Sequence, residues 1–232
     1  MENVVIVEAC RTAVGSMGGS LRPLHALELA CAVVRGVLDR SGLDPKEVDE
    51  VVLGQCRQTS DEPNLARVAA LQAGIPQEAS AYTVMRQCAS AMTAVQNGVM
   101  SIMCGQNDVV IAGGAESMSN AVFYLRDARW GVGTGNTELV DALTEGQFRS
   151  QPQETYGRYN MGATAENIAR QLGITRQEQD DFALASQRKA VAAIDAGRFR
   201  EEIVPVEVPQ GRKKPPVVFD TDEFPRRDTD EA

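Results

Sequence analysis

Long apolar runs, paired cysteine motifs and histidine are scarce in this chain of 232 residues. No stretch approaches the roughly 20 consecutive apolar residues of a transmembrane helix, so we expect no membrane span and no membrane partner. The chain runs from Met1 directly into the apolar Val4–Val7 stretch. It lacks the basic segment and the long apolar core of a secretory signal there. We therefore expect a cytoplasmic protein.

The five cysteines are odd in number and include no CxxC pair. This pattern disfavours a disulfide framework and a structural zinc site, and we expect no metal. The net charge of −9 disfavours nucleic acid as a partner, because an acidic surface repels a phosphate backbone. The single histidine, His25, lies beside Pro23 at the start of a predicted helix and is expected to be structural.

Residues 1–118 alternate between predicted strands and predicted helices. Strands are expected at Val4–Glu8, Val48–Leu53, Ala81–Met85 and Asp108–Gly113. Helices are expected from about Leu24 to Ser41, around Leu65–Ala73, and from Cys88 to about Cys104. Apolar strands that alternate with helices predict an α/β fold with a largely parallel sheet covered on both faces.

The composition changes after residue 118. Residues 119–160 are rich in glycine and polar residues, and we expect an irregular region there. Two helices are expected next, one over roughly Ala163–Leu172 and one from a Thr175 N-cap to Gly197. Ile203–Val208 is expected to be extended.

Cys88 stands out by its position between a predicted strand and a predicted helix. The apolar residues of that helix recur at spacings of three and four, which predicts one buried face: Met92, Val95, Val99 and Ile102. A thiol at the first turn lies at the positive end of the helix dipole, where unpaired N–H groups favour thiolate and can hold an oxyanion. Active groups of parallel sheets also gather just past the strand ends. Cys88 is therefore the candidate nucleophile, and the alternative is a small buried apolar residue.

The chain resembles the thiolase family in several motifs that occur in the family's order. These motifs are Arg11–Gly15, Asn64–Arg67, Gln87–Ser90, Ala112–Ser119, Met161–Asn167 and Phe199–Val206. The resemblance covers essentially the whole chain and implies that Cys88 is the acylated nucleophile. It also implies a thiolase-like fold. Residues 1–118 would form most of the N-terminal half of a layered α-β-α-β-α core with a mixed, mostly parallel sheet. Residues 119–232 would form an inserted loop domain, mainly helical and irregular, that binds coenzyme A.

The resemblance further implies an acyl-CoA C-acyltransferase of the acetyl-CoA acetyltransferase type, active in fatty acid metabolism. Such enzymes condense two acetyl-CoA molecules to acetoacetyl-CoA, or carry out the reverse thiolysis, as homodimers or homotetramers. The coenzyme A thioester is the substrate, and no tightly bound cofactor is expected. The family takes a histidine and a second cysteine from Gly-His-Pro and Cys-x-Gly-Gly motifs, and neither motif occurs here. The chain is therefore expected to be a truncated thiolase that lacks the fifth strand of the first half and the whole second half with its acid/base residues. By itself it is expected to be inactive or impaired.

Three positions match residues that contact coenzyme A in the family. Leu143 and Met161 correspond to residues along the pantetheine and acyl tunnel, and Arg212 corresponds to an arginine at the nucleotide end. A guanidinium suits both phosphate contact and stacking on adenine. Asn160 stands where many acetoacetyl-CoA thiolases have histidine, which leaves the short-chain assignment open.

Two other functions are compatible with the sequence. A β-ketoacyl synthase-like condensing enzyme would share the fold and a cysteine at a helix start, although Glu116–Ser119 and the long insertion favour a thiolase. The second alternative is a non-catalytic fragment that binds coenzyme A or supports oligomerisation. A thiol-reactivity profile separates that alternative from an enzyme, because a binding module needs no unusually reactive cysteine.

Overall fold

The computed structural model describes residues 3–230, which form two compact units. The first unit contains the chain up to Asn120 and also Arg198–Phe224, and the second contains Ala121–Gly197 and the residues from Pro225 onward. Arg198–Phe224 fell within the expected loop domain, residues 119–232, but packs with the first unit. Across the described residues, no helix has the length and apolar character to cross a membrane.

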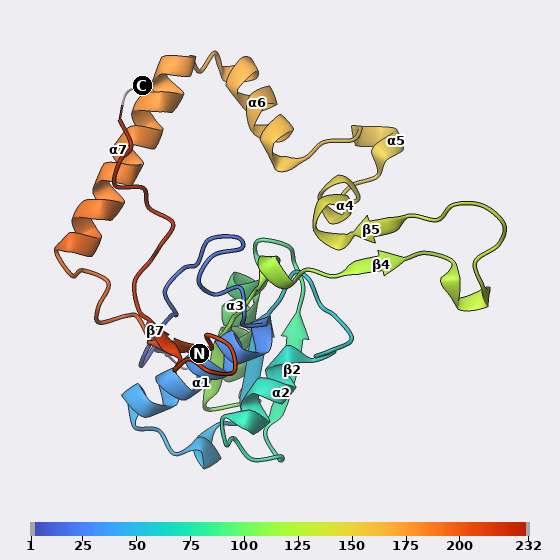
Figure 1. Ribbon diagram of the computed structural model, residues 1–232. Coiled ribbons are helices and arrows are strands. Elements are labelled where there is room, and N and C mark those ends of the chain that lie inside the picture. The colour runs from blue at the N-terminus through green and yellow to red at the C-terminus, as the bar shows by residue number, and fades with distance from the viewer. Residues whose placement is uncertain (1–2, 231–232) are drawn as a thin grey trace. The chain divides into compact units, whose positions relative to one another are not determined.

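A three-stranded parallel sheet forms the centre of the first unit (Figure 1). The strand order is β2-β1-β3, and the strands are β1 (Glu50–Gly54), β2 (Ser80–Val84) and β3 (Val110–Gly114). Val51 and Leu53 face a core made with α1 (Ala26–Ser41) and α2 (Leu65–Gln72). Side chains alternate between faces along a strand, so α3 (Ser90–Met103), which packs on Val110 and Ala112, lies on the opposite face. The predicted α/β fold with a parallel sheet is thus confirmed.

Local capping signals define the helices of this unit. The backbone N–H of His25, the N-cap of α1, donates to Glu28 Oε2 at 2.8 Å, and the structural role expected for its side chain stays a prediction. Gly42 ends α1 in a left-handed conformation with φ of 67°. Asn64 caps α2 by accepting from the Arg67 N–H. A short 3-10 helix at Pro45–Glu47 leads into β1, and another covers Met118–Asn120.

The predicted strand at Val4–Glu8 is not present. This segment is extended, but it belongs to no strand ladder, and Val5, Ile6 and Val7 are 72–80% exposed. A groove of about 920 Å³ lies between the segment and β3, with walls from α1 and α3. A strand requires hydrogen-bond partners along its length, and the groove separates this segment from the edge of β3. Among the described strands, β3 pairs only with β1.

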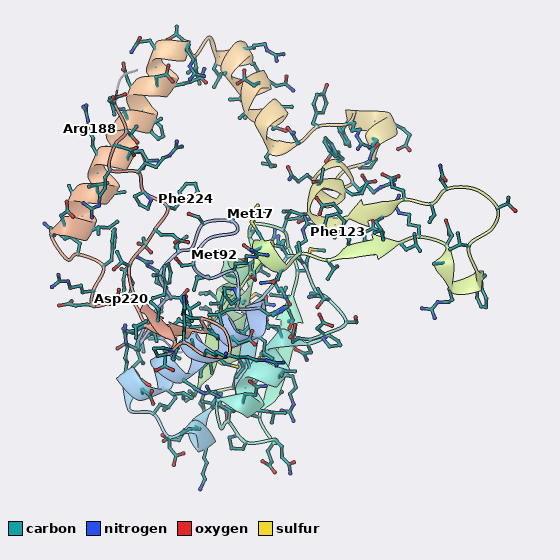
Figure 2. All side chains as sticks on the ribbon, in the orientation of Figure 1. Met17, Met92, Phe123, Arg188, Asp220 and Phe224 are labelled. Atoms are coloured by element: carbon teal, nitrogen blue, oxygen red, sulfur yellow. The ribbon has the colours of Figure 1, made fainter. Side chains whose placement is uncertain are left out.

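The buried face of α3 also differs from the prediction. Met92, which Figure 2 labels, lies near the start of α3. It is 63% exposed, whereas Val95, Val99 and Ile102 are half-buried and line the groove. The face buried against the sheet carries small residues instead, namely Ser90, Ala94, Gly98 and Ser101. A Cβ atom at Gly98 would lie 3.0 Å from Val110 Cγ1, so the close approach of α3 requires these small residues.

The segment 198–224 adds a short antiparallel hairpin to the first unit. It consists of β6 (Val206–Val208) and β7 (Val217–Phe219), and only the first lies in a region predicted to be extended. Val206 and Val208 are buried against Leu24 and Leu29, which explains why this segment packs with the first unit. The hairpin is expected to be held there mainly by this apolar contact.

The second unit contains two strands, four α-helices and one 3-10 helix among its described residues. The elements are β4 (Phe123–Leu125), a 3-10 helix (Ala128–Trp130), β5 (Leu139–Asp141), α4 (Ala142–Phe148), α5 (Gln153–Tyr156), α6 (Met161–Leu172) and α7 (Arg176–Asp195). β4 and β5 pair antiparallel, so residues 119–160 are more regular than predicted. Asn160 caps α6, and Thr175 with Glu178 forms the predicted capping box of α7. The predicted helices 163–172 and 175–197 are confirmed with small shifts at their ends.

Candidate active site

The carboxyl ends of the three parallel strands form one edge of the sheet. Gly54 lies in register with both Val84 and Gly114, so the residues that follow each strand emerge side by side. Cys56 follows β1, Cys88 follows β2 and Glu116 follows β3. This is the edge at which open parallel sheets place their active groups.

Hydrogen bonds connect the three segments at this edge. The backbone N–H of Cys56 donates to Glu116 Oε2 at 2.7 Å. The Cys56 thiol donates to the carbonyl oxygen of Gln87, the residue before Cys88, at 2.9 Å. Loops that are 30 to 60 residues apart in the chain are thereby tied into a single site.

The turn that carries Cys88 has an unusual backbone conformation. Gln87 has φ of 49°, in the left-handed region that residues with a Cβ atom rarely adopt. Its carbonyl oxygen accepts from the backbone N–H of Ser90 at 3.0 Å and from Ser90 Oγ at 2.6 Å. The same hydroxyl accepts from the backbone N–H of Arg86 at 2.9 Å. The Ser90 side chain therefore bonds to the backbone of both Arg86 and Gln87 and stabilises the turn.

Cys88 lies just before α3 rather than in its first turn. Ala89 is the N-cap and Ser90 is the first helical residue, so Cys88 precedes the cap by one position. The tight turn at Gln87 delays the start of the helix by two residues relative to the prediction. Cys88 nevertheless remains next to the positive end of α3, and its side chain is exposed. The position suits a nucleophile that must meet a substrate from solvent.

Two glycines allow the start of α3 to sit against the strand ends. A Cβ atom at Gly54 would lie 2.4 Å from the backbone nitrogen of Ala91. A Cβ atom at Gly114 would lie 2.7 Å from the carbonyl oxygen of Gly54 and 3.0 Å from Ala91 Cβ. Any side chain at either position would push the helix start, and with it Cys88, away from the sheet.

The other four cysteines occupy different environments. Cys31 is 4% exposed in the core, as predicted, and Cys104 caps the far end of α3. Cys10 donates to the carbonyl of Val33 at 3.4 Å. Cys56 alone among these four lies at the site. Burial is the main cause that raises the pKa of its thiol; a hydrogen bond between the thiol and Ser90 opposes this shift, and Glu116 adds to it. Cys56 therefore keeps its proton more firmly than an ordinary cysteine.

The three candidate residues for coenzyme A lie in different parts of the structure. Arg212 is exposed in the loop between β6 and β7 and belongs to the first unit, as Cys88 does. Leu143 lies in the first turn of α4 and is half-buried, and Met161 begins α6 and is 68% exposed. Leu143 and Met161 belong to the second unit. Their roles remain predictions.

Several site residues were not singled out from the sequence. Ser90 and Glu116 appeared only as parts of motifs, and the conformation of Gln87 left no sequence signal. One signal could have identified Glu116 as a site residue. Like Cys88, it comes just after a predicted strand. Gln55 is also at this edge; it is 3% exposed, and its Oε1 atom has no hydrogen-bond partner among the described residues.

Comparison with known proteins gives a consistent result. The family model described as the thiolase N-terminal domain matches residues 4–231. An acetyl-CoA acetyltransferase of Pseudomonas aeruginosa is 48% identical over 229 residues, which cover 99% of this chain and 57% of that relative. One from Cupriavidus necator is 46% identical over 228 residues, covering 98% and 56%.

A solved structure agrees with the sequence relatives. The crystal structure of the Bacillus anthracis acetyl-CoA acetyltransferase matches with a TM-score of 0.92 at 43% identity, over 98% of this chain and 56% of that one. The fold and the order of its elements are therefore shared along nearly all of the chain. The chain spans a little more than half the length of these relatives.

Proposed function

Since the chain belongs to the thiolase family, matching its N-terminal domain, we propose that it supplies the acyl-accepting nucleophile of an acetyl-CoA acetyltransferase. The observation that carries the proposal is the position of Cys88, which is exposed beside the start of α3 at the carboxyl edge of the sheet. The relatives are named acetyl-CoA acetyltransferases, which favours acetyl-CoA as the substrate.

The proposed step is a thioester exchange. The Cys88 sulfur attacks the acetyl carbonyl carbon, and a tetrahedral intermediate forms with negative charge on its oxygen. We propose that unpaired backbone N–H groups near the start of α3 stabilise that charge; those of Ala89 and Ser90 already donate to the carbonyl oxygens of Arg86 and Gln87. The bond to the coenzyme A sulfur then breaks. Coenzyme A leaves with the proton that Cys88 gave up, and acetyl-Cys88 remains.

The second half-reaction requires a base that removes a proton from the α-carbon of another acetyl-CoA. The Gly-His-Pro and Cys-x-Gly-Gly motifs that supply this chemistry in the family do not occur in these 232 residues. We therefore propose that the chain by itself carries out acylation at most. Condensation to acetoacetyl-CoA, and the reverse thiolysis in fatty acid metabolism, would be activities of a protein that also contains those groups.

The remaining parts of the proposal concern binding and location. Leu143 and Met161 are proposed to contact the pantetheine arm and Arg212 the nucleotide of coenzyme A, with no other cofactor. We further propose a homodimer or homotetramer, by analogy with the family. A cytoplasmic location is supported by the five cysteines, all of which are free thiols, as is usual in a reducing compartment.

Mass spectrometry of the intact chain after incubation with acetyl-CoA tests the proposal. We expect one acetyl group, which peptide mapping places on Cys88 and which disappears in Cys88→Ala. Cys104→Ala is the matched control, because it removes the other exposed cysteine and should leave the adduct unchanged. A folded chain that acquires no acetyl group on Cys88 would contradict the proposal and favour the non-catalytic alternative.

A further inference from the structure

We propose that Ser90 and Cys56 are positioning residues that together hold Gln87 in its left-handed conformation and so fix the place of Cys88. The inference rests on the proposed role of Cys88 as the nucleophile. It concerns how the turn is held rather than which residue reacts.

The turn needs external support. A residue with a Cβ atom is disfavoured at the φ of 49° that Gln87 adopts, and such strain persists only where surrounding contacts impose it. Without support, the backbone of Gln87 would relax to a right-handed or extended conformation. Cys88 is the next residue, so any such change would displace its thiol from the start of α3.

Three donors converge on the carbonyl oxygen of Gln87. Two belong to Ser90, its backbone N–H at 3.0 Å and its hydroxyl at 2.6 Å, and the third is the Cys56 thiol at 2.9 Å. Ser90 is 3% exposed, so water has little access to replace its hydroxyl. Three hydrogen bonds on one carbonyl fix the orientation of the peptide group between Gln87 and Cys88.

Cys56 is itself held firmly. Its backbone N–H donates to Glu116 Oε2 at 2.7 Å, which anchors the loop after β1 to the loop after β3. Burial raises the pKa of its thiol, so the proton that it donates to Gln87 is retained at neutral pH. Cys56 can therefore act as a neutral donor, which would leave nucleophilic attack to the exposed Cys88.

Removing one donor should reduce the fraction of molecules in which Cys88 is correctly placed. The observed rate of reaction at Cys88 is proportional to that fraction. The same relation holds for ligand binding, where the apparent affinity is reduced by the fraction of molecules in the binding-competent state. A typical intramolecular hydrogen bond corresponds to roughly a two- to tenfold change in such an equilibrium.

The test is the alkylation rate of each cysteine by iodoacetamide, followed by peptide mapping from neutral to alkaline pH. We expect Cys56→Ala to slow the alkylation of Cys88 by roughly two- to tenfold, whereas Cys56→Ser, which retains a donor, stays close to the parent chain. Cys104 serves as the internal reference in every sample. The pH profile shows whether the alkylation of Cys88 is slowed at every pH tested. This is the result expected if fewer molecules hold Cys88 in the correct position.

A second pair of variants tests the strain directly. Ser90→Ala should slow Cys88 at least as much as Cys56→Ala, and adding Gln87→Gly should restore part of the rate, because glycine adopts positive φ without support. Unchanged ratios of Cys88 to Cys104 rates in Cys56→Ala and Ser90→Ala would overturn the inference. Acetylation by acetyl-CoA is measured separately on the parent chain, so failure of the proposed function would be recognised independently.

Discussion

At the residue scale, Arg11 holds the Asp222 carboxylate with both terminal nitrogens of its guanidinium. The two contacts are 2.7 and 2.9 Å, and the backbone N–H of Val14 donates to the same carboxylate at 2.7 Å. The Asp222 side chain is 11% exposed, so this pair is shielded from solvent more than a typical surface ion pair. The hydrogen bond from Arg11 is the main cause that lowers the pKa of Asp222.

We predict that Asp222→Asn lowers the free energy of unfolding by about 1–2 kcal/mol, because it removes a charge-assisted pair. Asp220→Asn is the control; this neighbour is exposed and should change stability by less than about 0.5 kcal/mol. Urea denaturation of both variants measures the difference. Equal effects would contradict a special role for the Arg11 pair.

The same pair predicts a pH dependence. The folded chain binds a proton at Asp222 less readily than the unfolded chain does, because its pKa is lowered by folding. Its contribution to stability is therefore complete above the ordinary aspartate pKa of about 3.9 and is lost as the pH falls below that value. Denaturation midpoints measured over an acidic pH series should converge for the parent chain and Asp222→Asn. A constant gap between them would contradict this assignment.

The importance of Cys88 could be inferred from the sequence because its signals are local: a strand pattern before it, a helix pattern after it, and a family motif around it. The residues that hold its turn in place could not be inferred from the sequence. The Glu116 carboxylate accepts a hydrogen bond from the backbone N–H of Cys56, which is 60 residues away in the chain. Only the register of β1 with β3 brings the two residues together. The left-handed conformation of Gln87 was also hidden, because such a conformation normally calls for glycine.

At the element scale, the N-terminal segment and β1 are expected to respond very differently to substitution. Ile6 is 79% exposed in the unpaired segment, whereas Leu53 is 1% exposed in the central strand. We predict that Ile6→Asn changes the free energy of unfolding by no more than about 0.5 kcal/mol, whereas Leu53→Ala costs about 2–5 kcal/mol. Thermal and urea denaturation can both measure this. A loss in Ile6→Asn comparable to that in Leu53→Ala would show that the segment is buried or paired after all.

Element boundaries were predictable where the chain itself supplies the cap. The N-caps Asn64 and Thr175 and the C-cap Gly42 stand where the sequence placed the ends of helices. Val4–Glu8 was not predictable in the same way, because a strand depends on a neighbour that need not be near in sequence. The buried face of α3 was predicted wrongly for a related reason. The small residues of the helix pack against the sheet, whereas Val95, Val99 and Ile102 line the groove.

At the scale of the whole molecule, the two units differ in how much of each element is buried. Four of the five residues of β1 are buried, whereas α6 contains no buried residue and α7 only Leu184. A helix of 12 residues is marginally stable without packing. We predict that amide hydrogen exchange is slow in β1 and α1 and much faster in α6, as measured by mass spectrometry of peptides. Similar protection in β1 and α6 would contradict this description.

The change of composition near residue 118 lies close to Asn120, where the first segment of the first unit ends, but nothing in the sequence indicated that Arg198–Phe224 belongs to the same unit. That return depends on packing of Val206 and Val208 against Leu24 and Leu29, and on the bond from Arg11 to Asp222. The apolar contacts join residues about 180 positions apart, and Arg11 and Asp222 are 211 positions apart. No local pattern indicates these contacts, although Ile203–Val208 was expected to be extended and β6 lies within it.

The role of Cys88 as the nucleophile can be tested by comparing the reactivity of Cys88 and Cys104 in the unmodified chain. Both are exposed, and they flank the same helix, with Cys88 at its positive end and Cys104 at its negative end. Competitive alkylation at limiting reagent, resolved by peptide mapping, compares them within one sample. We predict that Cys88 reacts roughly three- to tenfold faster than Cys104, because the positive end of the helix favours a thiolate. Equal rates, or a faster Cys104, would contradict the assignment of Cys88 as the nucleophile that this fold presents.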